Sequence, residues 1–460
     1  MSEQKSFSSN LGAIMAAVGS AVGLGNIWRF PYITGKYGGG AFLIVYLFFV
    51  FLLGSVLMMS ELVIGRRTRC TPLKAYTSLA PKGQRGLWRA LGWLCVVTSF
   101  FILSQYLVLS GWTTGYVWHS VSGSLAALGT DASLIADFFR LFSTGGWNPV
   151  WYMVAFSALV LIVIFGGVQK GVELASKVLM PILVVLILVL CVRSLTLPGS
   201  MRGVEYLFSP DFSKLTAEGI LAALGQALFS LSVGMGVMVV YGSYLPANDN
   251  IFKTAMWITA CDTLIVLLAG LAIFPAVFSC GFDPAGGPGL VFCVLPNVFN
   301  SMGTAGAVFS MVFFLLLLVA ALTSAISLLE CLTACICEAT ARPDGKSGMR
   351  RWQGALLFFL LTTALGAVFT LSFSHLSGVK IADLSLFDFI DRINSIYLPP
   401  ICALCTTIFF GWEMPEADVR DEFTSHGAHR VRLYGAVRFL ARYVAPLALL
   451  IVLVTGIFMN

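Results

Sequence analysis

Charged side chains are scarce in this sequence. Lys, Arg, Asp and Glu make up 11% of its 460 residues, whereas an average protein carries about 25%. So few charges cannot cover the surface of a water-soluble globule, and the shortage also excludes a disordered chain, a coiled coil or a collagen. With 58% hydrophobic residues and a mean hydropathy of +0.90, the chain is predicted to cross a membrane many times.

Residues that carry catalysis or bind transition metals are also few. The four histidines lie near predicted loops or span ends, and the 11 cysteines have no histidine partners at metal-ligand spacing. We therefore do not expect an enzyme. Nucleic acid is not expected as a partner, because the basic residues form no stripe interleaved with aromatics. Most cysteines are interpreted as buried apolar side chains, although Cys280 and Cys293 flank an external loop and could form a disulfide.

Apolar runs separated by Gly, Pro and charged residues predict an all-α polytopic membrane protein with about eleven transmembrane helices. No long polar stretch divides the chain, so residues 1–460 are predicted to form a single transmembrane domain. Loops at 120–147 and 280–303 are long enough to carry short surface helices. The predicted spans are 11–34, 40–65, 88–119, 148–166, 172–193, 218–243, 252–279, 304–338, 352–373, 384–411 and 433–458.

The basic residues between the spans predict the orientation. A cytoplasmic amino terminus places 20 of the 28 Lys and Arg residues on the inner side and six on the outer side. Since inner loops are enriched in these residues, this orientation is favoured, and an odd number of spans then places the carboxyl terminus outside. The amino-terminal segment lacks a small-residue cleavage site and is not expected to be a signal peptide.

Two of the predicted spans carry helix-breaking residues near their middle. The first reads GSAVGLGNIWRFP over residues 19–31, and the sixth reads SLSVGMG over residues 230–236. Broken backbone is tolerated at membrane depth only where it lines a cavity or is buried in protein. Two such breaks in corresponding positions point to a binding site at the centre of an inverted-repeat transporter. The alternative is that Gly19 and Gly23 only allow close helix packing.

These motifs resemble the neurotransmitter:sodium symporter family, and in particular its bacterial amino-acid transporters. The resemblance rests on GSAVGLGNIWRFPY at 19–32, GGGAF at 38–42, GWTTGY at 111–116, SLSVGMG at 230–236 and AALTSAIS at 320–327. It implies the leucine-transporter-type fold, in which helices 1 and 6 are broken. Two inverted five-helix repeats would cover about 11–193 and 218–411, and 433–458 would be an extra helix.

The resemblance also implies a function and a location. The chain would be a sodium-coupled symporter that imports an amino acid by alternating access, in the cytoplasmic (inner) membrane of a bacterium. A nontransporting amino-acid sensor or a channel on the same fold remains the alternative. The oligomeric state is left open.

Two sodium ions are implied by the same resemblance. Asp262 departs from the family pattern, since many members have Asn there and obtain negative charge from bound chloride, so chloride is not expected here. The alternative is that Asp262 pairs with a neighbouring helix for structure alone. The first site would use the Ala21 carbonyl, Asn26, Ser230 and Asp262, and the second the Gly19 and Val22 carbonyls with Ala320, Thr323 and Ser324.

The substrate site follows from the resemblance as well. The substrate carboxylate would meet the amides of Leu24 and Gly25 and the hydroxyl of Tyr106, and its ammonium group would lie near Phe229 and Ser232. Met side chains suit large apolar ligands, so a hydrophobic or aromatic amino acid such as Trp, Phe, Tyr or Leu is favoured. The side-chain pocket would be formed by Ile102, Phe229, Met235, Ser324, Ser327 and Leu328.

Gates are expected on both sides of this site. On the outer side, Arg29 would pair with Asp388, or with Asp391 as the second choice, and Gln226 and Phe229 would thicken the gate.

On the inner side, Lys5 would pair with Glu338, with Tyr244 nearby. Lys5 and Phe7 stand where the family usually has Arg followed closely by Trp. Glu61 and Glu330 are acids within spans and are interpreted as anchors for the broken-helix backbone rather than as transport residues.

The fifth span begins with a possible weak point. Gly171 and Pro181 have a spacing seen in bacterial relatives, and both residues weaken a helix. The inner end of this span could therefore unwind and admit water to the second sodium site. The alternative is a simple helix start with an incidental proline.

Overall fold

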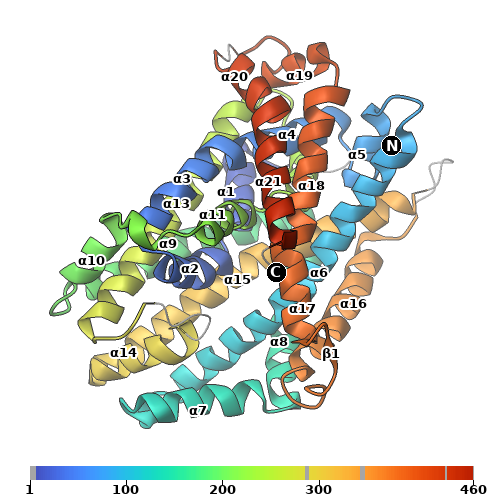
Figure 1. Ribbon diagram of the computed structural model, residues 1–460. Helices are drawn as coiled ribbons and strands as arrows, with labels where there is room; N and C mark the ends of the chain where they lie inside the picture. The colour runs from blue at the N-terminus through green and yellow to red at the C-terminus, as the bar shows by residue number, and fades with distance from the viewer. Residues whose placement is uncertain (1–6, 285–289, 342–347, 430–431, 459–460) are drawn as a thin grey trace.

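The computed structural model describes residues 7–284, 290–341, 348–429 and 432–458, and these are almost entirely helical (Figure 1). The strands in these ranges form a single hairpin, in which β1 (Lys380–Ile381) pairs with β2 (Leu384–Ser385). Each predicted span corresponds to helix in the structure, with ends that differ by a few residues. The spans are α1 (Asn10–Ala21) with η1 (Gly25–Arg29) and α2 (Phe30–Lys36), α3 (Gly40–Phe49) with α4 (Ser55–Thr68), α6 (Arg85–Val121), α8 (Trp147–Phe165), η4 (Val168–Glu173) with α9 (Leu174–Leu195), α11 (Ala217–Ser230) with α12 (Val237–Tyr244), α13 (Ile251–Ser279), α15 (Thr304–Ala339), α16 (Arg351–Leu371), α17 (Leu386–Arg392) with α18 (Leu398–Ile408), and α20 (Tyr434–Phe439) with α21 (Ala445–Phe458).

The two predicted breaks divide the first and sixth spans. Within the described ranges, nine helices are long and apolar enough to cross a membrane, and the pair formed by Leu11–Ala21 and Gly25–Lys36, bent by 46°, gives a tenth. The sixth span supplies the eleventh. Its first half, α11, has 14 residues and its second half, α12, has eight, so neither half is long enough alone.

Short helices occupy several connections between the spans. α7 (Ala132–Ser143) and α14 (Leu295–Ser301) lie in the two long loops where surface helices were predicted. α5 (Pro72–Leu79), α10 (Met201–Phe208) and α19 (Glu416–Phe423) were not predicted. These three have eight residues each, which is too short for hydrophobic periodicity to separate a helix from a loop.

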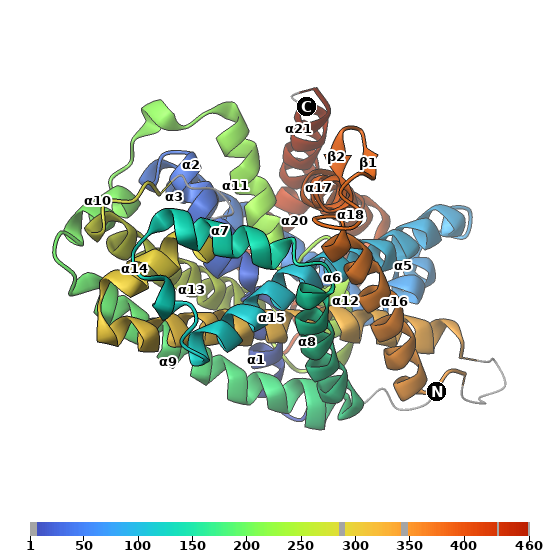
Figure 2. The ribbon, with the colours of Figure 1, turned by 90° about the horizontal axis from the view of Figure 1, so that it is seen from below.

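The helices form a bundle with a buried centre and an apolar periphery. α6 packs along α15, and α4 packs along α12. In the most apolar stretch of α6 and of α15, 78% of the residues are buried, against 33% for α16 and for the carboxyl-terminal span. Figure 2 accordingly shows α6, α12 and α15 near the middle of the projection and α16 and α9 at its edge. Both broken helices contact α15, the first through α1 and the sixth through α12.

The possible disulfide between Cys280 and Cys293 is not formed. Both residues are free cysteines, and Cys280 Sγ instead lies 3.3 Å from the hydroxyl of Ser301. The spacing of two cysteines across a loop does not fix their relative position, and Cys293 lies within the helical turn η6 (Leu290–Val294).

A buried ion pair fastens the end of α4 to α19. Arg66 Nε donates to Glu422 at 2.7 Å, and these side chains are 1% and 6% exposed. Arg66 also donates to the carbonyl oxygens of Asp249 and Glu422. A second ion pair between α4 and α19 lies nearer the surface. Arg67 pairs with Asp418 at 2.6 Å, and both side chains are about one third exposed. The buried pair therefore joins the end of α4, the segment around Asp249 and the end of α19.

The two ion pairs are expected to differ in their effect on stability. Glu422→Ala leaves the Arg66 guanidinium buried without its carboxylate, which costs about 3–5 kcal/mol, whereas Asp418→Ala removes a partly exposed pair worth about 1 kcal/mol or less. Thermal unfolding of the purified protein in detergent should show a drop of several degrees for Glu422→Ala and little change for Asp418→Ala. Equal midpoints for the two variants would contradict the proposed role of the buried pair.

Candidate functional site

The two broken segments meet at the centre of the bundle. The first consists of Val22, Gly23 and Leu24, and Val22 has extended backbone (φ −76°, ψ 104°). The second runs from Leu231 to Gly236, where Ser232, Gly234 and Gly236 adopt positive φ. The hydroxyl of Ser232 donates to the carbonyl oxygen of Ser20 at 2.8 Å. The second break therefore satisfies a backbone carbonyl beside the first.

Glycine is required where pocket side chains approach the first break. A Cβ atom on Gly23 would lie 2.4 Å from the hydroxyl oxygen of Ser324 and 2.9 Å from that of Tyr106. A Cβ atom on Gly25 would lie 2.7 Å from the ring of Phe229. Gly19, in contrast, has only ordinary contacts at 3.4 Å or more. Close helix packing alone does not account for Gly23 and Gly25, since their neighbours are side chains that face a pocket.

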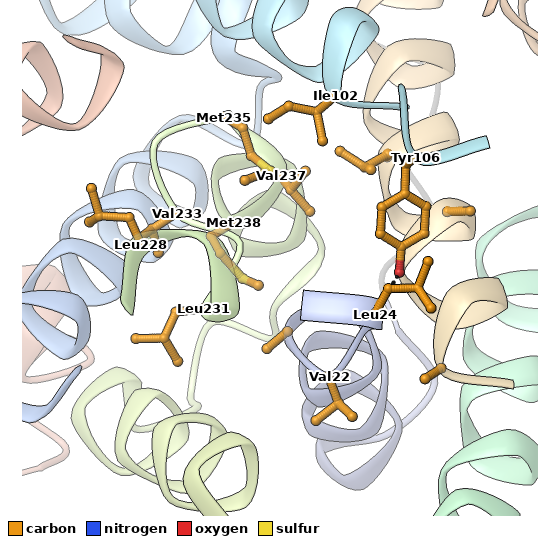
Figure 3. Packing of buried hydrophobic residues seen from close by; sticks show 14 of the residues in the cluster. Val22, Leu24, Ile102, Tyr106, Leu228, Leu231, Val233, Met235, Val237 and Met238 are labelled. Atoms are coloured by element: carbon orange, nitrogen blue, oxygen red, sulfur yellow. Dashed lines mark hydrogen bonds between the residues drawn. The ribbon is translucent and has the colours of Figure 1, made fainter. Parts of the chain in front are cut away.

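A pocket lies between the two breaks and the buried helices α6 and α15. It encloses about 20 Å³, which is room for about one water molecule. Figure 3 shows Ile102 and Met235 on one side of this region, with the Tyr106 hydroxyl directed at Leu24 on the other. The residues that line it are Ser20, Ala21, Gly23, Gly25, Asn26, Ile102, Tyr106, Phe229, Ser232, Met235, Ser324 and Leu328.

Most of the residues predicted for the substrate site line this pocket. Leu24 borders it through its backbone, where the amide donates to the Tyr106 hydroxyl at 3.0 Å. Ser327 does not line it. Its hydroxyl donates to the Thr323 carbonyl at 3.0 Å and accepts from Tyr241 at 2.7 Å. Ser327 lies one residue before Leu328, and one helical position is enough to turn a side chain away from a pocket.

A cluster of oxygen atoms joins η1, α11 and α13 beside this pocket. The carboxylate of Asp262 accepts from Asn26 Nδ2 at 2.6 Å and from the Ser230 hydroxyl at 2.6 Å. Ser230 also accepts from the hydroxyl of Tyr46 at 3.1 Å. Tyr46 was not predicted, because a tyrosine within a continuous apolar run carries no signal that separates it from core.

Asp262 is fully buried, yet no Lys or Arg nitrogen lies within 4.0 Å of it among the described residues. A buried carboxylate with only neutral partners is costly unless a cation accompanies it. Its surroundings provide carboxylate, amide and hydroxyl oxygens, which are the ligands that small hard cations prefer. The donor set therefore fits a sodium ion.

A second group of oxygens joins the first break to α15. Thr323 donates to the carbonyls of Ala320 at 3.0 Å and Val22 at 3.3 Å. Ser324 donates to the Ser20 carbonyl at 3.1 Å and to the Val22 carbonyl at 3.3 Å. The two hydroxyls thus hold α15 against unwound backbone, where carbonyl oxygens are available to a cation.

The outer gate predicted around Arg29 is not closed in this structure. The described residues show no ion pair between Arg29 and either Asp388 or Asp391, and the Arg29 guanidinium instead lies 5.1 Å from the ring centre of Phe229. The hydroxyl of Ser385 donates to Asp388 at 2.6 Å.

Amide side chains complete this outer region. The carboxylate of Asp391 accepts from the side-chain amide of Gln105 on α6, and Asn394 donates to Gln105 at 2.8 Å. Gln226 donates to the carbonyl of Gly25 at 2.9 Å. Gln105 was missed from the sequence, although a glutamine beside Tyr106 in an apolar span was a usable signal.

The inner gate differs from the prediction. Lys5 lies outside the described residues, and Glu338 accepts from the amide of Thr71 at 2.9 Å. Tyr244 donates to Glu330 at 2.8 Å rather than lying with Glu338, and Arg351 donates to Glu330 at 2.9 Å. Glu330 therefore joins α12 to α16 through one ion pair and one tyrosine hydroxyl, and among the described residues it accepts no hydrogen bond from broken-helix backbone.

Glu61 does contact broken-helix backbone. One carboxylate oxygen accepts from the amide of Gly234 at 2.6 Å. Gly234 has a φ of +77°, and a Cβ atom there would lie 2.4 Å from the carbonyl oxygen of Pro399. The carboxylate thus satisfies a backbone donor that the break removes from helical hydrogen bonding.

A further carboxylate, missed from the sequence, holds the start of the first span. Glu173 accepts from the amide of Ser8 at 2.8 Å and from Lys177 at 2.7 Å. It belongs to η4, which contains Gly171, and α9 runs without interruption through Pro181. The predicted weak point is thus a widened helical turn that is fastened to the first span.

Comparison with known proteins identifies the family. The sequence profile described as "Sodium:neurotransmitter symporter family" matches residues 4–135 and 142–460. An uncharacterized sodium-dependent transporter of Bacillus subtilis, YhdH, is 41% identical over 98% of both chains. Another from Methanocaldococcus jannaschii is 33% identical over 97% of this chain and 89% of its own.

A solved structure agrees with the fold. MhsT in complex with L-phenylalanine superposes with a TM-score of 0.88 and 38% identity, covering 98% of this chain and 100% of MhsT. The predicted all-α fold with broken helices 1 and 6 is thereby confirmed. With a matching profile over nearly its whole length and relatives that are sodium-dependent transporters, the chain belongs to the sodium:neurotransmitter symporter family.

Proposed function

We propose that this protein imports a hydrophobic or aromatic amino acid together with sodium by alternating access. The observation that carries the proposal is Asp262, a buried carboxylate with no Lys or Arg nitrogen within 4.0 Å in the part of the chain that the structure describes, which adjoins a pocket lined by broken-helix backbone. Transport, rather than chemistry, is the expected use of such a site. The location would be the cytoplasmic membrane of a bacterium, with the amino terminus inside.

The substrate carboxylate would bind where the first helix is unwound. The Leu24 amide donates to the Tyr106 hydroxyl and can donate to a substrate carboxylate instead. The Gly25 amide lies at the same helix start. Both belong to the amino-terminal end of η1, where the helix dipole favours an anion. The substrate ammonium would lie near Phe229 and the Ser232 hydroxyl.

Two sodium ions would bind as co-transported substrates. At the first site, the substrate carboxylate would join the ligands, so amino acid and ion would stabilise each other's binding. Asp262 supplies a fixed negative charge there, so no chloride would be needed. The first site comprises Ala21, Asn26, Ser230 and Asp262, and the second Gly19, Val22, Ala320, Thr323 and Ser324.

The side-chain pocket is expected to favour apolar substrates. It must widen to accept one. Ile102, Phe229, Met235 and Leu328 surround a space of about 20 Å³, which is too small for the side chain of Phe or Trp. Met235 can provide the room, because its unbranched side chain has several rotatable bonds and packs against varied apolar shapes. Trp, Phe, Tyr and Leu are the expected substrates.

Closure would alternate between two sets of contacts. On the outer side, Arg29 would leave Phe229 and pair with Asp391 or Asp388, so that the substrate pocket is covered. On the inner side, release would require the contacts of Ser8 with Glu173 and of Glu330 with Arg351 to open. Since Gly171 lies in the turn that carries Glu173, opening would also expose the second sodium site to water.

Sodium-driven uptake tests the transport proposal directly. Proteoliposomes with an inward sodium gradient should accumulate labelled L-phenylalanine or L-tryptophan above its equilibrium level, and accumulation should stop when potassium replaces sodium. Flux that ignores the sodium gradient would indicate a channel. Sodium-dependent binding without any flux would indicate a sensor on the same fold.

The charge of Asp262 is tested by a neutral replacement. Asp262→Asn should lower sodium-driven uptake by about tenfold or more, because an ionised ligand contributes more than a neutral one, and added chloride should restore part of the activity. Uptake is measured with and without chloride, and Asp137→Asn, which removes an exposed acid, serves as the control. Unchanged uptake and ion dependence in Asp262→Asn would count against this role.

Pocket size is tested at Met235. Met235→Phe should reduce the space for the substrate side chain and weaken competition by L-tryptophan about tenfold or more relative to L-alanine or L-valine. Met311→Phe makes the same change on the partly exposed face of α15 and should leave the preference unchanged. If tryptophan competes equally in Met235→Phe and in the unaltered protein, the pocket has been assigned to the wrong residues.

A further inference from the structure

A second cavity lies outside the substrate site, between the ends of α9, α13 and α15 and the short helix α14. These ends lie on the flank of the bundle away from α16 (Figures 1 and 2). The cavity shares no residue with the substrate pocket. Along α15, its Phe313 is about 16 Å from Ser324 at ~1.5 Å per residue. It is lined by Leu190, Arg193, Ser194, Ala272, Ile273, Ala276, Leu295, Phe299, Met302, Phe309 and Phe313.

Arg193 is the charged residue of this lining, and its charge is not neutralised nearby. Across residues 7–284, 290–341, 348–429 and 432–458, no carboxylate lies within 4.0 Å of its guanidinium. The guanidinium carbon lies 5.6 Å from the ring centre of Phe309. Nε is buried and has no hydrogen-bond acceptor among these residues. Arg193 Nε is thus a buried hydrogen-bond donor that belongs to a positively charged group.

Ser194, the next residue, provides a second donor in the same lining. Its side chain is 2% exposed, and its hydroxyl has no partner within the described part of the chain. An unpaired buried hydroxyl costs free energy, and the remaining lining is apolar apart from Arg193. Two adjacent donors without an acceptor fit a ligand that presents an anionic oxygen.

The size of the cavity and its surroundings indicate what else such a ligand contains. It encloses about 10 Å³, which is about the space of one water molecule and admits one oxygen atom of a larger head group. The neighbouring side chains on α9 and α15 are apolar and outward-facing, since Val192 is 65% and Val308 is 55% exposed. In a protein that spans a membrane, this exposed surface faces acyl chains. The ligand is therefore expected to carry an acyl chain.

We infer that Arg193 and Ser194 form a binding site for an anionic amphiphile. A head-group oxygen, from a fatty-acid carboxylate or a phospholipid phosphate, accepts from Arg193 Nε and the Ser194 hydroxyl. The acyl chain follows the apolar seam between α9 and α15. Charge-assisted hydrogen bonds of this kind are stronger than neutral ones. The site does not depend on which substrate is transported, so its test does not use transport.

The test measures the thermal unfolding of delipidated protein in a neutral detergent. Oleate and dioleoyl phosphatidylglycerol are titrated separately, with methyl oleate and dioleoyl phosphatidylcholine as probes without net charge, and acetate and inorganic phosphate as anions without a chain. Arg193→Gln removes the charge in the cavity. Arg202→Gln is the matched control, since Arg202 is an exposed arginine of α10 that does not line the cavity.

We expect oleate or phosphatidylglycerol to raise the unfolding midpoint, and Arg193→Gln to raise the half-saturating concentration about tenfold or more. Arg202→Gln should behave as the unaltered protein. A response to oleate alone identifies a fatty-acid site, and a response to phosphatidylglycerol alone identifies a phospholipid site.

Ser194→Ala adds a second measurement that does not depend on the stability of Arg193→Gln. It should weaken the lipid response while leaving the lipid-free midpoint unchanged or higher, because it removes an unpaired hydroxyl. The inference is overturned if neither lipid shifts the midpoint, if methyl oleate or acetate acts as strongly as oleate, or if the Arg193 and Arg202 variants respond alike.

Discussion

The contact between the broken helices depends on the buried carboxylate of Asp262, which has no Lys or Arg nitrogen within 4.0 Å among the described residues. Asp262 accepts hydrogen bonds from Asn26 on the first broken helix and from Ser230 at the end of α11, so it joins three spans through neutral partners. Burying a lone carboxylate is unfavourable, and a cation at this point would relieve the cost. In our account, sodium completes the contact between the broken helices, and the substrate carboxylate shares the ion.

Side chains from neighbouring segments satisfy several backbone groups of the broken helices. Ser232 and Ser324 both donate to the Ser20 carbonyl, and Glu61 accepts from the Gly234 amide. These contacts bring polar groups to the centre of an otherwise apolar bundle. They also link each break to the helices around it.

The fold and most of the site could be predicted from local sequence, because span length, helix breakers and the family motifs all lie within short segments. Residues that act across the bundle could not. Glu330 was expected to hold backbone but pairs with Arg351, and Glu173 and Gln105 were not singled out although both hold other spans. Which partner a buried polar side chain finds is decided by packing between distant spans, and the limits of the two repeats stay a prediction.

The central claim is that the protein needs sodium before it can hold its substrate. Equilibrium binding of labelled L-phenylalanine and L-tryptophan to the purified protein, titrated with sodium at constant ionic strength against potassium, tests this without relying on flux. We expect no specific binding in potassium and a rise with sodium that is steeper than for a single ion. Equal affinity for the amino acid in potassium and in sodium would contradict it.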